Sequence, residues 1–300
     1  MPANMERALD DLERRLPGRL GRPASDGWNA ARLVFSPAAR TRTPLASVRP
    51  GNRDEVAAVL KWASEHGVRL SPRSGGHAFD GFTVRGDTVL LDLRDLREAR
   101  LDADNRLHAM PGLTNMDIAK VLSPKDRALP IGDCPMVGLG GLATGGGFGY
   151  AGRLLGLVSD QMVEATVALP DGSLVRAAAD ERPDLFWACR GGGGSAGVVT
   201  DFVFETAGIS RITSLVVVWD WTRSEEAFEA FADCLRHAPD RLDLKLKLRT
   251  TGADRFVDMA SAGPPEATPG TPLVHIDGQF IGPRAEAEPF LQSLVNHPAV

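Results

Sequence analysis

The pattern of hydrophobic and polar positions predicts a βαβ unit near the start of the chain. Apolar residues recur at i, i+3, i+4 and i+7 within residues 52–67, which is the spacing of an amphipathic helix. Asn52 and Glu55 have the spacing of a capping box at its start. Short runs at 46–50 and 68–72 flank this helix, and we expect both to be strands. The segment after the second strand then lies at the carboxyl end of a sheet, where ligands commonly bind.

Further segments with alternating or apolar patterns complete a first domain. Residues 87–93 and 197–206 predict strands, and residues 114–122 predict a short capped helix. Two apolar runs, 162–169 and 173–178, flank a Pro-Asp-Gly turn and predict a hairpin.

Beyond this domain the pattern changes to longer strands and helices. We expect strands at 214–221, 242–250 and 272–282 and helices at 225–238 and 285–295. Strict alternation in the middle strand places four polar side chains on one face, namely Asp243, Lys245, Lys247 and Arg249. We expect this to be a solvated sheet face, and a substrate-facing role is the alternative.

Composition excludes several classes of protein. The net charge of −5 comes without a basic patch, so nucleic acid is not an expected partner. Three cysteines do not form a disulfide framework, and no apolar run is long enough to span a membrane. The first 20 residues lack the apolar stretch of a signal peptide. We therefore expect a soluble, cytoplasmic protein.

Three glycine-rich segments carry the candidate chemistry. The first, SPRSGGHAFDG at residues 71–81, places His77 directly after two glycines. In residues 138–152 eight of fifteen residues are glycine, and residues 190–200 contain four consecutive glycines before a strand. Dense glycine lets main-chain N–H groups approach a polyanion closely. Three such segments at separate strand ends predict one large cofactor that contains phosphate.

A Rossmann nicotinamide site is the alternative that the same glycines allow. Residues 138–143 match GxGxxA, and Asp160 follows at about the distance of the ribose-binding acid. Two prolines and a glycine interrupt residues 129–137, which makes this segment a poor central strand. The glycines after the match are too many for the packed helix that the motif requires.

Taken together, the three segments resemble a known family. The motifs are PRSGGHAFDG, GDCPMVGLGGLATGGGFGYAGRLLGLVSDQ and DLFWACRGGGGSAGVVTDF, and they occur in the family's order. They resemble the flavin domain of the vanillyl-alcohol-oxidase superfamily and, more narrowly, of the berberine-bridge-enzyme-like FAD-linked oxidoreductases. The resemblance implies an α+β fold with a PCMH-type FAD-binding domain of two α/β subdomains at 42–210. An N-terminal helix and loop at 1–41 precede it, and an incomplete substrate domain of antiparallel sheet and helices follows at 211–300.

The resemblance also implies which residues hold FAD. His77 matches the histidine that the family bonds to the 8α-methyl of FAD. Cys134 matches the cysteine that a subset of the family bonds to C6 of the isoalloxazine. The pyrophosphate is expected beside Arg73, Ser74, Gly75, Gly76, Gly138, Gly140, Gly141, Gly145, Gly146 and Gly147. Asp160 and Val199 match further positions near the cofactor, and no metal site is implied.

The activity that the resemblance implies is that of an oxidoreductase. Such an enzyme takes a hydride from an alcohol or amine carbon of a sugar or secondary metabolite onto flavin N5 and passes electrons to O2. Ser195-Ala196 stands where the family has Asn-Phe, and Gln161 replaces an Asn, so the flavin contacts differ in detail. Family members carry their proton-accepting residue in a later segment, so no catalytic base is predicted. The alternatives are a flavin-binding remnant without turnover and a Rossmann NAD(P) dehydrogenase.

Overall fold

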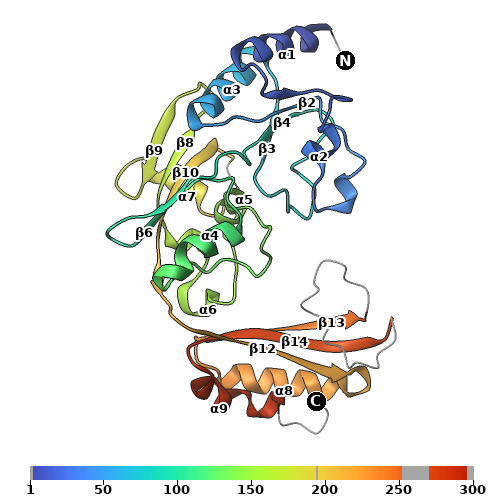
Figure 1. Ribbon diagram of the computed structural model, residues 1–300, viewed down its shortest axis with the longest axis vertical. Coiled ribbons are helices and arrows are strands. Elements are labelled where there is room, and N and C mark those ends of the chain that lie inside the picture. Colours follow the sequence, from blue (N-terminus) through green and yellow to red (C-terminus); the bar gives the residue numbers. More distant parts are fainter. Residues whose placement is uncertain (1–2, 194, 252–269, 296–300) are drawn as a thin grey trace. The chain divides into compact units, whose positions relative to one another are not determined.

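The computed structural model describes residues 3–193, 195–251 and 270–295, which form two compact units (Figure 1). Unit 1 comprises Met1–Phe148 and Leu157–Ala207, and unit 2 comprises Gly149–Gly156 and Gly208–Val300. Unit 1 contains two larger sheets with a hydrophobic cluster at each, and unit 2 contains one sheet with its own cluster.

The first sheet of unit 1 confirms the predicted βαβ unit. Its strand order is β1-β2-β4-β3, and β2 and β3 both pair with β4 in parallel. The strands are β1 (Leu20–Gly21), β2 (Ala46–Val48), β3 (Leu70–Arg73) and β4 (Val89–Asp92). Helix α3 (Arg53–His66) connects β2 to β3. Asn52 Oδ1 accepts the N–H of Glu55 at 2.9 Å, as the capping pattern predicts, and Gly67 ends the helix with φ of 62°.

The N-terminal segment of unit 1 packs on α3. Helix α1 (Ala3–Arg15) buries Leu9 and Leu12 in the core of the first sheet, and Trp62 Nε1 donates to the carbonyl of Ala8 at 3.0 Å. Helix α2 (Trp28–Arg32) and the single turn η1 (Pro37–Ala39) follow before β2.

The second sheet of unit 1 is antiparallel, in the order β5-β6-β10-β8-β9. It consists of β5 (Ala99–Leu101), β6 (Arg106–Ala109), β8 (Met162–Ala168), β9 (Leu174–Ala178) and β10 (Val198–Glu205). Strands β8 and β9 form the predicted hairpin. The helical elements are α4 (Asn115–Leu122), η2 (Ser123–Lys125), α5 (Leu139–Thr144), η3 (Val158–Gln161) and α7 (Pro183–Cys189).

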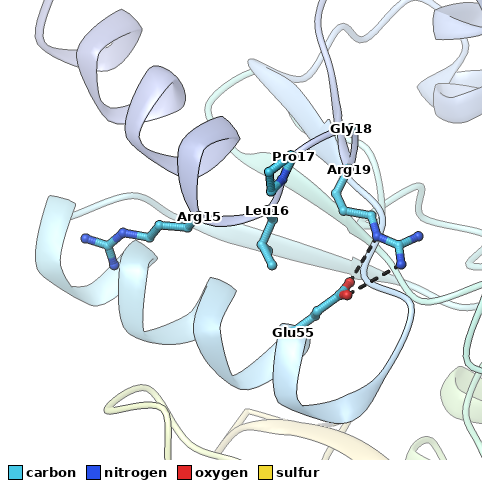
Figure 2. A pocket seen from close by; sticks show the side chains of 6 residues that line it. All are labelled: Arg15, Leu16, Pro17, Gly18, Arg19 and Glu55. Atoms are coloured by element: carbon cyan, nitrogen blue, oxygen red, sulfur yellow. Dashed lines mark hydrogen bonds and ion pairs between the residues drawn. The ribbon is translucent and has the colours of Figure 1, made fainter.

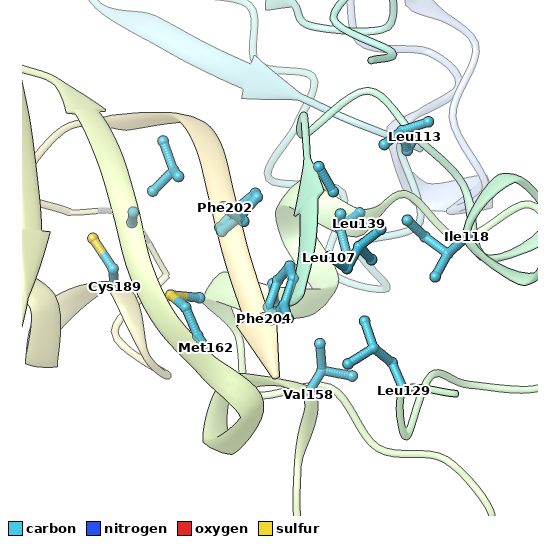
Figure 3. Close-up of a cluster of buried hydrophobic side chains, with 14 of the residues drawn as sticks. Leu107, Leu113, Ile118, Leu129, Leu139, Val158, Met162, Cys189, Phe202 and Phe204 are labelled. Atoms are coloured by element: carbon cyan, nitrogen blue, oxygen red, sulfur yellow. The ribbon is translucent and has the colours of Figure 1, made fainter. Parts of the chain in front are cut away.

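One hydrophobic cluster anchors α4 and α5 to this second sheet (Figure 3). Phe202 and Phe204 of β10 are fully buried in it, with ring centroids 5.5 Å apart. Ile118 of α4 and Leu139 of α5 are buried in the same cluster. Because these side chains hold both helices, the loops that lead into α4 and α5 start from fixed positions.

Unit 2 is a three-stranded antiparallel sheet with two helices on one face (Figure 1). The strands β12 (Ile212–Asp220), β14 (Pro272–Ile281) and β13 (Leu242–Thr250) pair in that order. Helices α8 (Ser224–His237) and α9 (Arg284–Val295) bury Trp219, Ile276 and Phe280 against this face. The short elements α6 (Gly152–Leu155), η4 (Trp221–Arg223), β7 (Arg127–Ala128) and β11 (Ala207–Gly208) complete the chain.

Within the described ranges, no helix combines the length and apolar character needed to cross a bilayer. The same ranges hold no group of three or more His, Cys, Asp or Glu side chains that could bind a metal ion.

Candidate cofactor site

The His77 loop leaves the carboxyl end of β3 and is held by residues from the segment after α2. The N–H of Phe35 donates to the carbonyl of Gly76 at 3.0 Å, and Gly76 has φ of 73°. The Phe35 ring stacks on the His77 imidazole, with centroids 5.1 Å apart and planes 16° from parallel. The imidazole is therefore half-buried and oriented by an aromatic ring.

Arg73 fixes the segment that carries Phe35. Its side chain is 5% exposed, and its terminal nitrogens donate to the carbonyls of Ala31 and, at 2.7 Å, Leu33. Nε of Arg73 is buried and has no hydrogen-bond partner among the described residues. Both terminal nitrogens of Arg73, which were expected at a pyrophosphate, thus donate to main-chain carbonyls, and the buried Nε keeps its N–H without a partner among the described residues.

The electrostatics of this loop favour a neutral His77. Burial lowers the pKa of His77, and the charge of Arg73 lowers it further. The pKa of Arg73 itself is lowered to about 10, mainly by burial and also by Arg94. At neutral pH one ring nitrogen of His77 therefore keeps a free lone pair, which is the form a nucleophilic imidazole needs.

The loop after β3 that carries His77 (the His77 loop) and the segment before α5 that carries Cys134 (the Cys134 loop) meet through their main chains, at Gly75 and Gly138. A Cβ atom on Gly75 would lie 2.4 Å from the nitrogen of Gly138, and one on Gly138 would lie 2.1 Å from the nitrogen of Gly75. Ser74 Oγ donates to the carbonyl of Pro111 at 2.5 Å and accepts the N–H of Gly140 at 3.2 Å. Only glycine allows this approach, so the two segments predicted to hold one cofactor lie side by side.

Asn115, which the sequence did not single out, holds the Cys134 loop. Its Nδ2 donates to the carbonyls of Gly132 at 3.2 Å and Cys134 at 3.0 Å. The residue is 3% exposed and follows Thr114, which caps α4 in a capping box with Asp117. A buried asparagine at the first position of a helix has no sequence signature that separates it from an ordinary polar residue.

The other predicted glycines have different roles. A Cβ on Gly140 would lie 2.9 Å from Pro111, and one on Gly147 would lie 2.9 Å from Val158. Gly146 and Gly147 have φ of 108° and 79°, a region that favours glycine. Gly141 faces open space, and Gly145 ends α5.

The third glycine segment docks at the far end of α5. The N–H groups of Gly191 and Gly193 donate to the carbonyl of Thr144 at 2.9 and 3.0 Å. All three glycine-rich segments therefore contact α5 or the residues directly before it. Glycine at these positions lets the main chain come close to a phosphate-containing chain, although the N–H groups of Gly140, Gly191 and Gly193 are bonded within the protein.

Asp160 and Val199 have structural contacts. Asp160 Oδ2 accepts the N–H of Leu157 at 2.8 Å and thereby starts η3, and Asp160 Oδ1 lies 3.6 Å from Nη2 of Arg190. Val199 is 5% exposed and packs in the core of the second sheet. Among the described residues, the hydrogen bond and ion pair of Asp160 and the core packing of Val199 involve neither His77 nor Cys134.

The segment before Gly138 contradicts the Rossmann alternative. Residues 129–137 form no strand, and Gly138 makes only an isolated bridge to Thr114. A Rossmann glycine turn must follow a strand directly, so this hypothesis is wrong.

A polar network occupies the sheet face of unit 2 that α8 and α9 leave uncovered. The Tyr150 hydroxyl donates to Asp277 Oδ2, and Asp277 Oδ1 lies 2.7 Å from Lys247 Nζ and 3.1 Å from His275 Nδ1. Lys245 Nζ lies 3.9 Å from the centroid of the Tyr150 ring. Burial alone would raise the pKa of Asp277, but its contacts with His275, Lys247 and Tyr150 lower that pKa well below its usual range.

The expectation of a solvated face is wrong for Asp243, which is buried, whereas Lys245, Lys247 and Arg249 are partly exposed. His275 is 3% exposed and Asp243 is 7% exposed. The segment Gly149–Gly156 docks there, because Arg153 Nη1 also donates to the carbonyl of Leu242 at 2.8 Å.

Two surface pockets lie outside the glycine segments. One, of about 360 Å³, opens between the end of α1 and the start of α3 (Figure 2). Its lining includes the ion pair between Arg19 Nε and Glu55 Oε2, 3.1 Å apart. The other, of about 490 Å³, has a mixed-charge lining that includes Arg53, His108 and Asp201. Neither contains a predicted site residue.

Comparison with known proteins agrees with this arrangement. Residues 44–178 match the FAD binding domain family. The chain resembles the xylooligosaccharide oxidase of Thermothelomyces thermophilus, with 36% identity over 194 residues, 63% of this chain and 39% of that protein.

Solved structures show the same fold. The Physcomitrella patens BBE-like 1 protein superposes with a TM-score of 0.84 at 23% identity, over 97% of this chain and 60% of that one. A glucooligosaccharide oxidase of Acremonium strictum superposes with a TM-score of 0.80 at 25% identity, over 96% of this chain and 58% of that one. Another structure of that enzyme concerns its 6-S-cysteinyl, 8α-N1-histidyl FAD. The chain thus has the fold of BBE-like, PCMH-type flavoenzymes and spans less than two thirds of the length of each of these proteins.

Proposed function

We propose that this chain is part of an FAD-linked oxidoreductase whose flavin is bonded to both His77 and Cys134. The main support is the main-chain contact between the two loops at Gly75 and Gly138. Two bonds to one ring system require that the two loops lie side by side, and the Acremonium strictum enzyme carries both a cysteinyl and a histidyl bond.

Different residues of unit 1 would hold different parts of the cofactor. The neutral imidazole of His77, oriented by Phe35, supplies one nucleophile, and the thiol of Cys134 supplies the other. The glycine segments would let the pyrophosphate approach the main chain closely, and Nε of Arg73, which has no partner among the described residues, would be a side-chain donor. When bound, the flavin accepts a hydride from a substrate carbon and passes its electrons to O2.

The proposed substrate is a sugar that is oxidised at an alcohol carbon. Two of the similar proteins are named as xylooligosaccharide and glucooligosaccharide oxidases. On the polar sheet face of unit 2, the partly exposed ammonium group of Lys247 is compatible with this class, because it can donate a hydrogen bond to a sugar hydroxyl. The chain offers no separate observation that favours an amine substrate.

Intact mass after acid denaturation tests the covalent bonds. We expect the wild-type chain to retain the mass of one FAD and His77→Ala with Cys134→Ala combined to retain none. Cys189→Ala is the matched control, because Cys189 is buried in the hydrophobic core, and it should retain the flavin. Wild-type protein without any flavin mass would refute the proposal.

A peroxide assay with xylo- and glucooligosaccharides tests turnover. We expect hydrogen peroxide in proportion to the sugar consumed. A covalent flavin that no sugar reduces would instead support a flavin-binding remnant without turnover.

A further inference from the structure

The position of Cys134 depends on one buried amide. Asn115 donates through Nδ2 to the carbonyls on both sides of Asp133, those of Gly132 and Cys134. Carbonyl oxygens only accept hydrogen bonds, so a donor is required at this position. Oδ1 of Asn115 is buried and lacks a hydrogen-bond partner within the described residues. The protein therefore bears the cost of one buried, unpaired acceptor while the Nδ2 group satisfies two carbonyls.

The first turn of α4 holds the same loop through its main chain. The N–H of Asn115 donates to the carbonyl of Val137 at 3.0 Å, and the N–H of Met116 donates to the carbonyl of Pro135 at 3.1 Å. Residues 132–137 therefore wrap around the start of α4, which Ile118 anchors in the core. Cys134 lies within this wrapped loop and is partly exposed, so its thiol is accessible while its main chain is fixed.

We propose that Asn115 is the positioning residue that presents the Cys134 thiol to the flavin ring. This inference rests on the proposed function. Bond formation joins the sulfur to a ring carbon, releases the thiol proton and the ring hydrogen, and transfers two electrons by way of the flavin to dioxygen, which becomes hydrogen peroxide. The reaction requires the sulfur to stay within bonding reach of that carbon, and small displacements lower such rates strongly.

The contacts of Asn115 allow the bond between Cys134 and the flavin to be lost without loss of the bond between His77 and the flavin. Within the described part of the chain, the side-chain hydrogen bonds of Asn115 go to the carbonyls of Gly132 and Cys134, whereas His77 is oriented by Phe35. Removing the amide donor should therefore loosen residues 132–134, whose carbonyls lose their donor, while the main-chain bonds at Pro135 and Val137 and the His77 loop stay in place.

Peptide mapping of the flavin tests this inference. In the sequence, trypsin sites after Arg73, Arg85, Arg127 and Arg153 place His77 and Cys134 on different peptides, residues 74–85 and 128–153. The full chain, expressed with FAD, is denatured in acid and digested, and the flavin is located by fluorescence and mass. The visible spectrum is recorded before digestion, because a sulfur on the ring changes it.

Asn115→Asp keeps the size of the side chain but places a carboxylate against two carbonyls. We expect the fraction of flavin that joins both peptides to fall by about tenfold to a hundredfold, while flavin on residues 74–85 persists. Asn115→Ala, which removes the donor without adding charge, should give the same pattern. The control is Asn29→Asp, because Asn29 is exposed and accepts from Arg32 through Oδ1, and it should match the wild type.

Doubly linked flavin at the wild-type level in both Asn115 variants would overturn the inference. Flavin on neither peptide in both variants would overturn it as well, because Asn115 would then support the whole site and not the thiol alone. Wild-type protein without flavin on either peptide would instead refute the proposed function.

Discussion

The contact between Gly75 and Gly138 predicts a large difference between two similar substitutions. Gly138 has φ of −82° and ψ of 137°, a conformation that alanine adopts freely, so Gly138→Ala introduces no backbone strain. Its methyl group would nevertheless lie 2.1 Å from the nitrogen and 2.8 Å from the Cα of Gly75. Gly141→Ala adds the same methyl group three residues later, where no atom lies within 4 Å.

The two substitutions should change stability in opposite directions. Overpacking costs about 1–3 kcal/mol, and a main-chain obstacle cannot rotate away as a side chain can. For a unit of this size 1 kcal/mol corresponds to about 2–4 °C, so the Tm of Gly138→Ala should fall by about 2–12 °C. Replacing glycine within a helix by alanine gains about 0.5–1 kcal/mol, so Gly141→Ala should raise the Tm by about 1–4 °C.

Thermal unfolding followed by circular dichroism measures both shifts, with FAD at the same concentration in every sample. Retained flavin mass after acid denaturation should also fall in Gly138→Ala and persist in Gly141→Ala, because the former separates the two loops. Equal Tm values for Gly138→Ala and the wild type would refute the argument from close approach.

Three further predictions concern single side chains. Burial and the charge of Arg73 lower the pKa of His77, so the imidazole stays neutral down to mildly acidic pH. In Cys134→Ala protein, the rate at which FAD attaches should therefore stay constant from pH 8 to about 6.5 and fall only in more acidic buffer. A decline that begins near pH 7.5 would contradict this. Tyr150→Phe removes a donor to a charged carboxylate and should lower the free energy of unfolding of unit 2 by about 1.5–3 kcal/mol in urea, whereas an unchanged midpoint would count against the network. Asn52→Ala should cost about 1 kcal/mol through loss of the α3 cap, and a stability equal to the wild type would show that the cap is not limiting.

The sequence predicted those parts of the fold that depend on local patterns. The cap at Asn52 and the β8–β9 hairpin follow from spacing within a few residues, and the structure confirms both. The three glycine motifs identified the segments that meet around α5, because glycine density reflects a local need for close approach.

Contacts between distant segments could not be predicted in the same way. Nothing in the sequence distinguishes Gly138, where an added Cβ would meet another main chain, from Gly141, where it would face open space. The guanidinium of Arg73 could equally have faced a phosphate, but it binds carbonyls more than 35 residues earlier in the chain. Asn115 acts through partners 17 and 19 residues away, a separation that hydrophobic periodicity does not encode.

The assignment of Gly149–Gly156 to unit 2 has a consequence for synthesis on the ribosome. This segment is translated about 90 residues before β13, the strand to which Arg153 donates, and well before Asp277, the partner of Tyr150. Nascent unit 1 can close its own sheets once Ala207 has emerged, but this segment must remain undocked until β13 and β14 are complete. A gene fragment that stops at residue 207 would therefore lack Asp277 and Leu242, the acceptors of Tyr150 and Arg153. A single cut in the chain does not separate the two units, because unit 2 consists of two segments that are distant in the sequence.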